Sequence, residues 1–128
     1  MEEKLLARFD RYISENNYKN RSEALRDLIR KELVQEEWLK SKKDVAGAII
    51  LVYDHHRKEL MDNLVHLQHQ HQEIIISSQH IHLDHRICLE VVIVKGRIDA
   101  VYALASKLKA AKGVKHAALA QSTMGRDI

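Results

Sequence analysis

The sequence predicts an α+β chain in which two helices precede a domain of strands and helices. Two changes of pattern predict this class. Over residues 2–38, apolar side chains recur every three or four positions, which is the period of an amphipathic helix. After a polar segment at residues 39–44, residues 45–53 are almost wholly apolar and rich in Val and Ile, which is typical of a strand buried on both faces.

The N-terminal part of the chain is expected to form two helices. The first covers residues 2–16. After a polar turn, Asn20 is a suitable N-cap for a second helix over residues 21–38, and Glu23 completes a capping-box-like pair with it. The apolar faces of the two helices are Leu5, Leu6, Phe9 and Ile13, and Ala24, Leu25, Leu28, Ile29 and Leu33. Because two short amphipathic helices cannot bury a full core alone, we expect residues 1–38 to pair with a partner chain.

Residues 39–44 are expected to link these helices to a second domain, residues 45–122, with a tail at residues 123–128. The pattern predicts the order strand, helix, strand, strand, helix, strand. The predicted bounds are 45–53, 57–72, 74–82, 88–95, 97–112 and 114–120. Gly113 is expected to end the second of these helices as its C′ residue. This order is the split βαβ, ferredoxin-like unit. Because its strands are apolar on both sides, we expect the uncovered sheet face to mediate oligomerisation.

Composition limits the class of protein. Charged residues make up 30% and hydrophobic residues 45%, which is an ordinary globular composition. No apolar run approaches the roughly 20 residues that span a membrane, and residues 1–4 do not begin a signal peptide, so we expect a cytoplasmic protein. The single cysteine, Cys88, cannot form an intrachain disulfide. The net charge of +3 is low for a protein that binds nucleic acid by bulk charge, so DNA binding would depend on the placement of charges.

Histidine is concentrated in one part of the chain. Of nine histidines, eight lie between His55 and His85, and imidazole is the commonest transition-metal side chain. His80 and His82 are two apart on a predicted strand, so their side chains share a face and their Cα atoms lie about 6.5 Å apart. If the strands on either side of residues 83–87 form a hairpin, Cys88 returns beside this pair. The three residues then form a metal site that lacks one donor.

The fourth donor and the metal stay open at this stage. His66, His69 or His71, near the end of the preceding helix, could donate from the same chain or from a partner. A planar site would favour Ni(II) or Cu(II), and a tetrahedral site Zn(II). The competing interpretation is of surface histidines and a small core cysteine. We favour solvated or hydrogen-bonded side chains for the histidines at positions 55, 56, 66, 71 and 85, and expect no metal role for the one at position 116.

Two stretches resemble known families. Residues 20–27, Asn-Arg-Ser-Glu-Ala-Leu-Arg-Asp, resemble the start of the second helix of ribbon-helix-helix DNA-binding proteins. Residues 79–90, Gln-His-Ile-His-Leu-Asp-His-Arg-Ile-Cys-Leu-Glu, resemble the metal hairpin of the NikR nickel-responsive regulators. The likeness extends over nearly the whole chain, including residues 52–55, 67–69 and 94–96. It implies a repressor with an ACT-type, ferredoxin-like domain that forms a tetramer as a dimer of dimers.

The resemblance also implies the ligands. His80, His82 and Cys88 would hold Ni(II) in a planar site, and His69 matches a fourth ligand that comes from another subunit. A metal bound across two subunits stabilises one tetramer arrangement and so biases the DNA-binding arms. Glu90 matches a residue near the site that would orient ligands, with a solvated strand glutamate as the alternative.

Other residues match further sites of the family. Glu23 and Asp27 are four apart on a helix and match an alkali-metal site, for K(I), at the domain interface of the DNA-bound form. For these two we favour a capping residue and a solvated aspartate. Arg57 and Lys58 match a basic pair that contacts DNA phosphates, although an ordinary solvated face is the expectation we prefer.

The match breaks at the N-terminus. Ribbon-helix-helix dimers insert a two-stranded ribbon into the major groove, and its strand precedes the first helix. Here residues 1–6 already match that helix. Three explanations stay open. The true protein is longer and Met1 is an alternative start, or the sequence is shortened, or the protein is a divergent member of the family. In the last case phosphate contacts from Arg21, Ser22 and the helix N-termini would give weak, salt-sensitive binding.

A nickel-dependent transcriptional repressor is the leading hypothesis for the function. The main alternative is a metal-binding oligomer, a buffer or a signalling module, without sequence-specific DNA binding. An enzyme ranks third. A catalytic metal needs an open coordination position, which His69 would close, and the sequence contains no second catalytic constellation.

Overall fold

A computed structural model describes residues 2–128, so Met1 and its expected role as an alternative start lie outside the described residues. The elements are α1 (Glu3–Glu15), α2 (Arg21–Lys40), β1 (Val45–Asp54), α3 (Lys58–Gln70), β2 (Ile75–His82), β3 (Ile87–Gly96), α4 (Ile98–Ala110) and β4 (Val114–Gln121). Each predicted helix and strand is present within two residues of its expected bounds. The predicted α+β class is confirmed.

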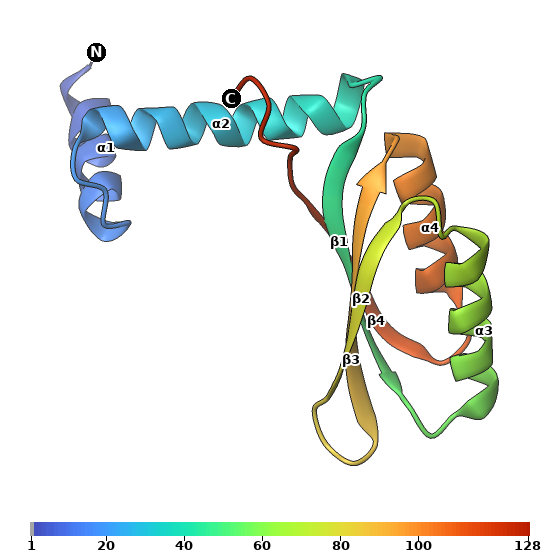
Figure 1. Cartoon of the computed structure of the whole chain (residues 1–128). Coiled ribbons are helices and arrows are strands. Elements are labelled where there is room, and N and C mark those ends of the chain that lie inside the picture. The colour runs from blue at the N-terminus through green and yellow to red at the C-terminus, as the bar shows by residue number, and fades with distance from the viewer. Residues whose placement is uncertain (1) are drawn as a thin grey trace.

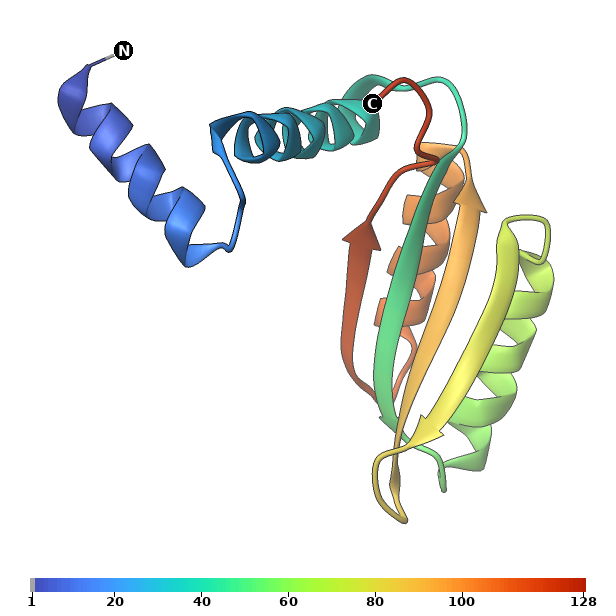
Figure 2. The same ribbon diagram turned by 60° about the vertical axis from the view of Figure 1, so that its left-hand side comes forward.

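The four strands form one sheet in the order β2-β3-β1-β4, with every neighbouring pair antiparallel. Helices α3 and α4 cover one face of this sheet (Figures 1 and 2). This is the ferredoxin-like arrangement that the element order predicts. Alternate residues of β1 and β3 are buried towards the helices, whereas the intervening residues are half-buried or exposed on the open face. The open face is therefore uncovered within one chain.

The end of α2 is built into the sheet domain, residues 45–122. Trp38 is only 3% exposed and belongs to the same hydrophobic core as the strands. Its indole Nε1 donates a hydrogen bond of 2.8 Å to the carbonyl oxygen of Ser122. There is no room for a side chain at position 47. A Cβ on Gly47 would lie 3.3 Å from Cζ2 of Trp38 and 2.7 Å from the carbonyl oxygen of Ala120.

Helix α2 also runs two residues into the segment expected to be a linker. Leu39 and Lys40 are good helix formers, and Lys40 forms an i,i+4 ion pair of 3.5 Å with Glu36. The connection to β1 is therefore shorter than expected, at residues 41–44. In Figures 1 and 2, only the C-terminal part of α2 meets the sheet domain, and α1 lies well away from it.

Polar contacts help to hold the N-terminal helices together, and Ala24 on α2 is fully buried. The side chain of Asn20 accepts a hydrogen bond of 3.0 Å from the backbone N–H of Glu23, which confirms the predicted N-cap. Arg21 forms a two-contact ion pair with Asp10 on α1, at 2.9 Å for each contact. The predicted apolar face of α2 is mostly open in one chain, with Leu25, Leu28 and Ile29 exposed.

The expectation for Gly113 is wrong in detail. Helix α4 ends at Ala110 with Ala111 as its C-cap, so Gly113 is not the C′ residue. It is instead the third residue of a turn closed by a 3.1 Å hydrogen bond from the N–H of Val114 to the carbonyl oxygen of Ala111. Its φ of +102° lies in the left-handed region, which favours glycine.

Candidate metal centre

Strands β2 and β3 form the hairpin that the sequence predicts. In its register His80 lies opposite Glu90, and His82 lies opposite Cys88. Because side chains alternate along a strand, these four residues share one face of the sheet, the face on which α3 packs. The hairpin thus returns the thiol of Cys88 beside the histidine pair.

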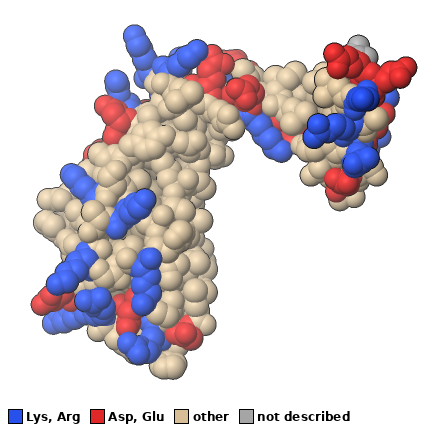
Figure 3. Space-filling model, turned by 180° about the vertical axis from the view of Figure 1, so that it is seen from behind, with Lys and Arg blue, Asp and Glu red and all other residues tan. Residues whose placement is uncertain are grey.

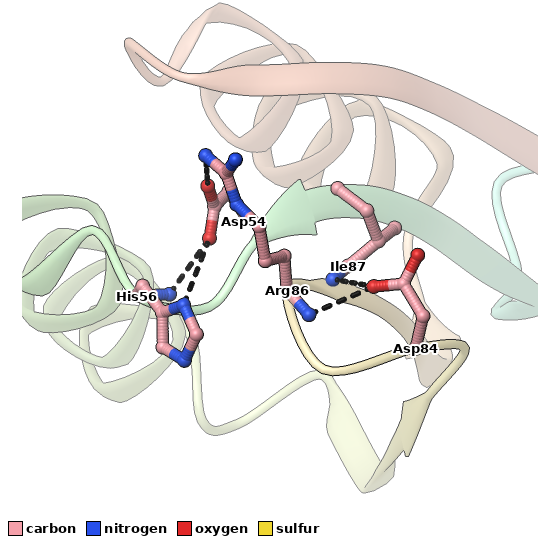
Figure 4. A network of polar contacts seen from close by, with 5 residues as sticks. All are labelled: Asp54, His56, Asp84, Arg86 and Ile87. Carbon is pink, nitrogen blue, oxygen red and sulfur yellow. Dashed lines mark hydrogen bonds and ion pairs between the residues drawn. The ribbon is translucent and has the colours of Figure 1, made fainter.

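The turn of this hairpin is fixed by two carboxylates (Figure 4). Oδ1 of Asp84 accepts hydrogen bonds of 2.7 Å from the backbone N–H groups of Arg86 and Ile87. Asp54, at the end of β1, accepts one of 2.9 Å from the backbone N–H of His56 and pairs with the Arg86 guanidinium at 3.0 Å. These contacts hold the turn against β1, next to Cys88.

The same contacts lower the pKa values of two carboxyl groups. The backbone N–H groups of Ile87 and Arg86 lower the pKa of Asp84. The backbone N–H of His56, followed by the side chain of Arg86, lowers the pKa of Asp54. Both carboxylates therefore remain charged at neutral pH.

His80 contacts a buried polar network. Its Nδ1 lies 3.2 Å from the hydroxyl of Tyr53, and its Nε2 lies 3.4 Å from Oε2 of Glu90. Glu90 is fully buried, so it is not a solvated strand residue. The hydroxyl of Tyr53 donates to Oε1 of Glu90 at 2.7 Å, and Nε2 of Gln68 donates to Oε2 at 2.7 Å.

Tyr53 acts as a hydrogen-bond donor in this network. Burial raises the pKa of Tyr53, and the adjacent carboxylate of Glu90 raises it further. The phenol therefore keeps its proton and satisfies one oxygen of a carboxylate that has no access to water.

His82 has a different neighbour. Its ring stacks on that of His55, with 4.4 Å between centroids and 3° between planes. Nε2 of His55 is buried and has no hydrogen-bond partner among the described residues. The expectation of a solvated or hydrogen-bonded His55 is wrong for this atom.

The donors present suit a transition metal. Two imidazoles and one thiol on one face of a single hairpin are borderline ligands for Ni(II), Cu(II) or Zn(II). His69, on α3, lines a cavity of about 270 Å³ together with His80. Within residues 2–128, no three His, Cys, Asp or Glu side chains converge closely enough to hold an ion. Ligation through either nitrogen of His80 requires that side chain to give up a contact with Tyr53 or Glu90.

The other candidate residues lie apart from the hairpin. Asp27 is hydrogen bonded to the hydroxyl of Tyr18 and lies 3.5 Å from Nζ of Lys31, so it is not simply solvated. The hydrogen bond from Tyr18 lowers the pKa of Asp27. Glu23 lines the same hollow as Asp27, and Ser22 is exposed at the start of α2.

Basic side chains gather on the sheet domain. Seen from behind (Figure 3), Lys and Arg side chains lie along one side of it, beside an uncharged surface. Arg57 and Lys58 are exposed and line a hollow of about 510 Å³ together with Lys112. The guanidinium of Arg57 packs against the turn at Gly113.

Three contacts of the site were missed by sequence reasoning. Tyr53 and Gln68 hold Glu90, and His55 stacks on His82. A partial signal for Tyr53 is its alternation on the buried face of the first strand. For Gln68 the only local signal is its position next to His69.

Comparison with known proteins identifies the family. Residues 46–122 match the NikR C terminal nickel binding domain. Relatives named "Putative nickel-responsive regulator" include one from Chlorobium limicola, 53% identical over 98% of this chain and 92% of its own, and one from Syntrophus aciditrophicus, 50% identical over 95% and 88%. A third, from Thermococcus onnurineus, is 44% identical over 98% of this chain and 91% of its own.

A solved structure supports the fold alone. The uncharacterized protein TM1266 from Thermotoga maritima superposes with a TM-score of 0.57 at 18% identity, covering 62% of this chain and 98% of its own.

The matching nickel-binding domain and the names of the relatives define a metal-binding regulator, not an enzyme. The chain belongs to the NikR family of nickel-responsive regulators.

Proposed function

We propose that this chain is a nickel-dependent transcriptional repressor that binds Ni(II) between subunits and couples this binding to operator DNA. The observation that carries the proposal is the register of the hairpin, which sets His82 opposite Cys88 and keeps His80 on the same face. This hairpin lies inside the segment that matches the nickel-binding domain.

The ligands we propose are His80, His82 and Cys88 of one subunit and His69 of a neighbouring subunit. Together these side chains would hold Ni(II) between the two chains, because two imidazoles and a thiolate are ligands that suit it. Glu90 would orient His80, because a ligating histidine usually has its second nitrogen held by a carboxylate or carbonyl. Asp84 and Asp54 would keep the turn, and hence Cys88, in place.

Assembly and DNA binding complete the proposal. The exposed apolar side chains of α2 and the open sheet face would be covered in a tetramer of ACT-type domains, a dimer of dimers in the cytoplasm. Arg21, Ser22, Arg57 and Lys58 would contact DNA phosphates. Glu23 and Asp27 would hold K(I) in the DNA-bound form. In the structure of the single chain, the hydroxyl of Tyr18 contacts Asp27 at this place.

None of the helices described in residues 2–128 is long and apolar enough to cross a membrane.

The test is an absorption titration with Ni(II). Wild type is expected to develop a thiolate-to-metal charge-transfer band that Cys88→Ser abolishes and that the exposed control Ser77→Ala retains. Persistence of the band in Cys88→Ser would refute the site. A gel shift with the promoter of a nickel-uptake operon is expected only when Ni(II) is present. Absence of any specific shift would leave a nickel-binding oligomer without a DNA function.

A further inference from the structure

One buried carboxylate links the three elements that carry proposed ligands, α3, β2 and β3. Glu90, on β3, is fully buried, and its oxygens have three neighbours from three other elements. Tyr53 of β1 and Gln68 of α3 each donate to it at 2.7 Å, and Nε2 of His80 on β2 lies 3.4 Å away. A buried carboxylate without such donors would be strongly unfavourable, so these contacts constrain the surrounding elements.

Gln68 is the only one of these neighbours on a helix. Its side chain is half-buried, and its amide donates to the carboxylate of Glu90 on β3. Helix α3 itself lies against the sheet (Figure 1). The next residue along α3 is His69, which lines the same cavity as His80. A rotation of α3 about its axis would break the contact of Gln68 and move His69 at the same time.

We propose that Gln68 is a positioning residue which, through Glu90, fixes α3 against the hairpin and so sets the placement of His69 and His80 together. The proposal rests on the proposed function, because it concerns how those ligands are placed. If His69 binds the metal of a neighbouring subunit, the hydrogen bond from Gln68 to Glu90 couples two metal sites. It connects His69, a ligand of the neighbouring site, to the hairpin that holds the chain's own site.

The test compares Gln68→Ala with Gln70→Ala, an exposed glutamine two residues along the same helix. In the metal-free full chain, the imidazole NMR signals of both His69 and His80 are expected to move in Gln68→Ala and to stay in Gln70→Ala. Ni(II) affinity is expected to fall about 10-fold to 100-fold in Gln68→Ala, the usual effect of removing an outer partner of a ligand. Movement of the His80 signal alone, or of neither signal, would overturn the proposal.

A double variant separates positioning from general damage. Gln68→Glu combined with Glu90→Gln reverses the donor and the acceptor and keeps the hydrogen bond. The His69 signal is expected to return to its wild-type position in this variant, and a displaced signal would contradict the proposal even if Gln68→Ala did not fold. If wild type shows no band that depends on Cys88, the proposed function fails, whereas the metal-free NMR comparison still decides the role of Gln68.

Discussion

Individual carboxyl groups near the proposed site differ in the groups that donate hydrogen bonds to them. Glu90 is enclosed and depends on the hydroxyl of Tyr53 and the amide of Gln68. Asp54 depends on a backbone N–H and on the guanidinium of Arg86, whose side chain remains largely exposed. The first arrangement holds ligands in place, and the second holds the turn of the hairpin.

The stabilisation that Asp54 provides is expected to depend on pH. The pKa of Asp54 is lowered in the folded chain, so the stabilisation that it provides is present above the unfolded pKa of about 3.9 and is lost as pH falls through the folded value. Asp54→Asn is therefore expected to lower the melting temperature at pH 7, and the difference from wild type is expected to shrink below about pH 4. Thermal melts by circular dichroism would measure this.

Asp62→Asn, an exposed change on α3, is the matched control and should alter the melting temperature little at any pH. A difference between wild type and Asp54→Asn that stays constant from pH 7 to pH 3 would show that charge at Asp54 is not what stabilises the turn.

At the scale of elements, sequence patterns predicted more of the fold than of the site. Hydrophobic period and turn residues are local signals, so they predicted the order of helices and strands, the cap at Asn20 and the shared face of His80 and His82. Contacts between elements leave no such signal. The indole of Trp38 meets Ser122, which is 84 residues away in the sequence, and Gln68 meets Glu90 across the helix-sheet interface.

Trp38 anchors the end of α2 to the sheet domain. Trp38→Ala is expected to lower the free energy of unfolding by about 3–5 kcal/mol, because it removes a buried aromatic side chain and its hydrogen bond to Ser122. Trp38→Phe keeps a ring and should cost less. Urea unfolding followed by circular dichroism would measure both.

Leu39 serves as the control, since it is 82% exposed and directly follows Trp38 on the helix. Leu39→Ala should change the unfolding free energy by no more than about 0.5 kcal/mol. An equally small change in Trp38→Ala would mean that the end of α2 is not anchored to the sheet domain.

At the scale of the whole molecule, one chain leaves two apolar surfaces open. Leu25, Leu28 and Ile29 are exposed on α2, and the sheet face opposite α3 and α4 is uncovered (Figures 1 and 2). Contiguous apolar surface of this kind marks a protein contact. The metal site that we propose would also be completed between chains, with three donors from the hairpin of one chain and the fourth from α3 of another.

In the oligomer that we propose, His69 of a neighbouring subunit completes the nickel site. Mixing two variants tests this arrangement: His69→Ala, which keeps the hairpin donors, and Cys88→Ser, which keeps His69. Each is titrated alone and after subunit exchange, at a Ni(II) concentration where neither gives a thiolate charge-transfer band. We predict that the band appears in the mixed oligomers, because a hairpin from one variant meets His69 from the other. A mixture that matches the sum of the two separate titrations would contradict a shared site.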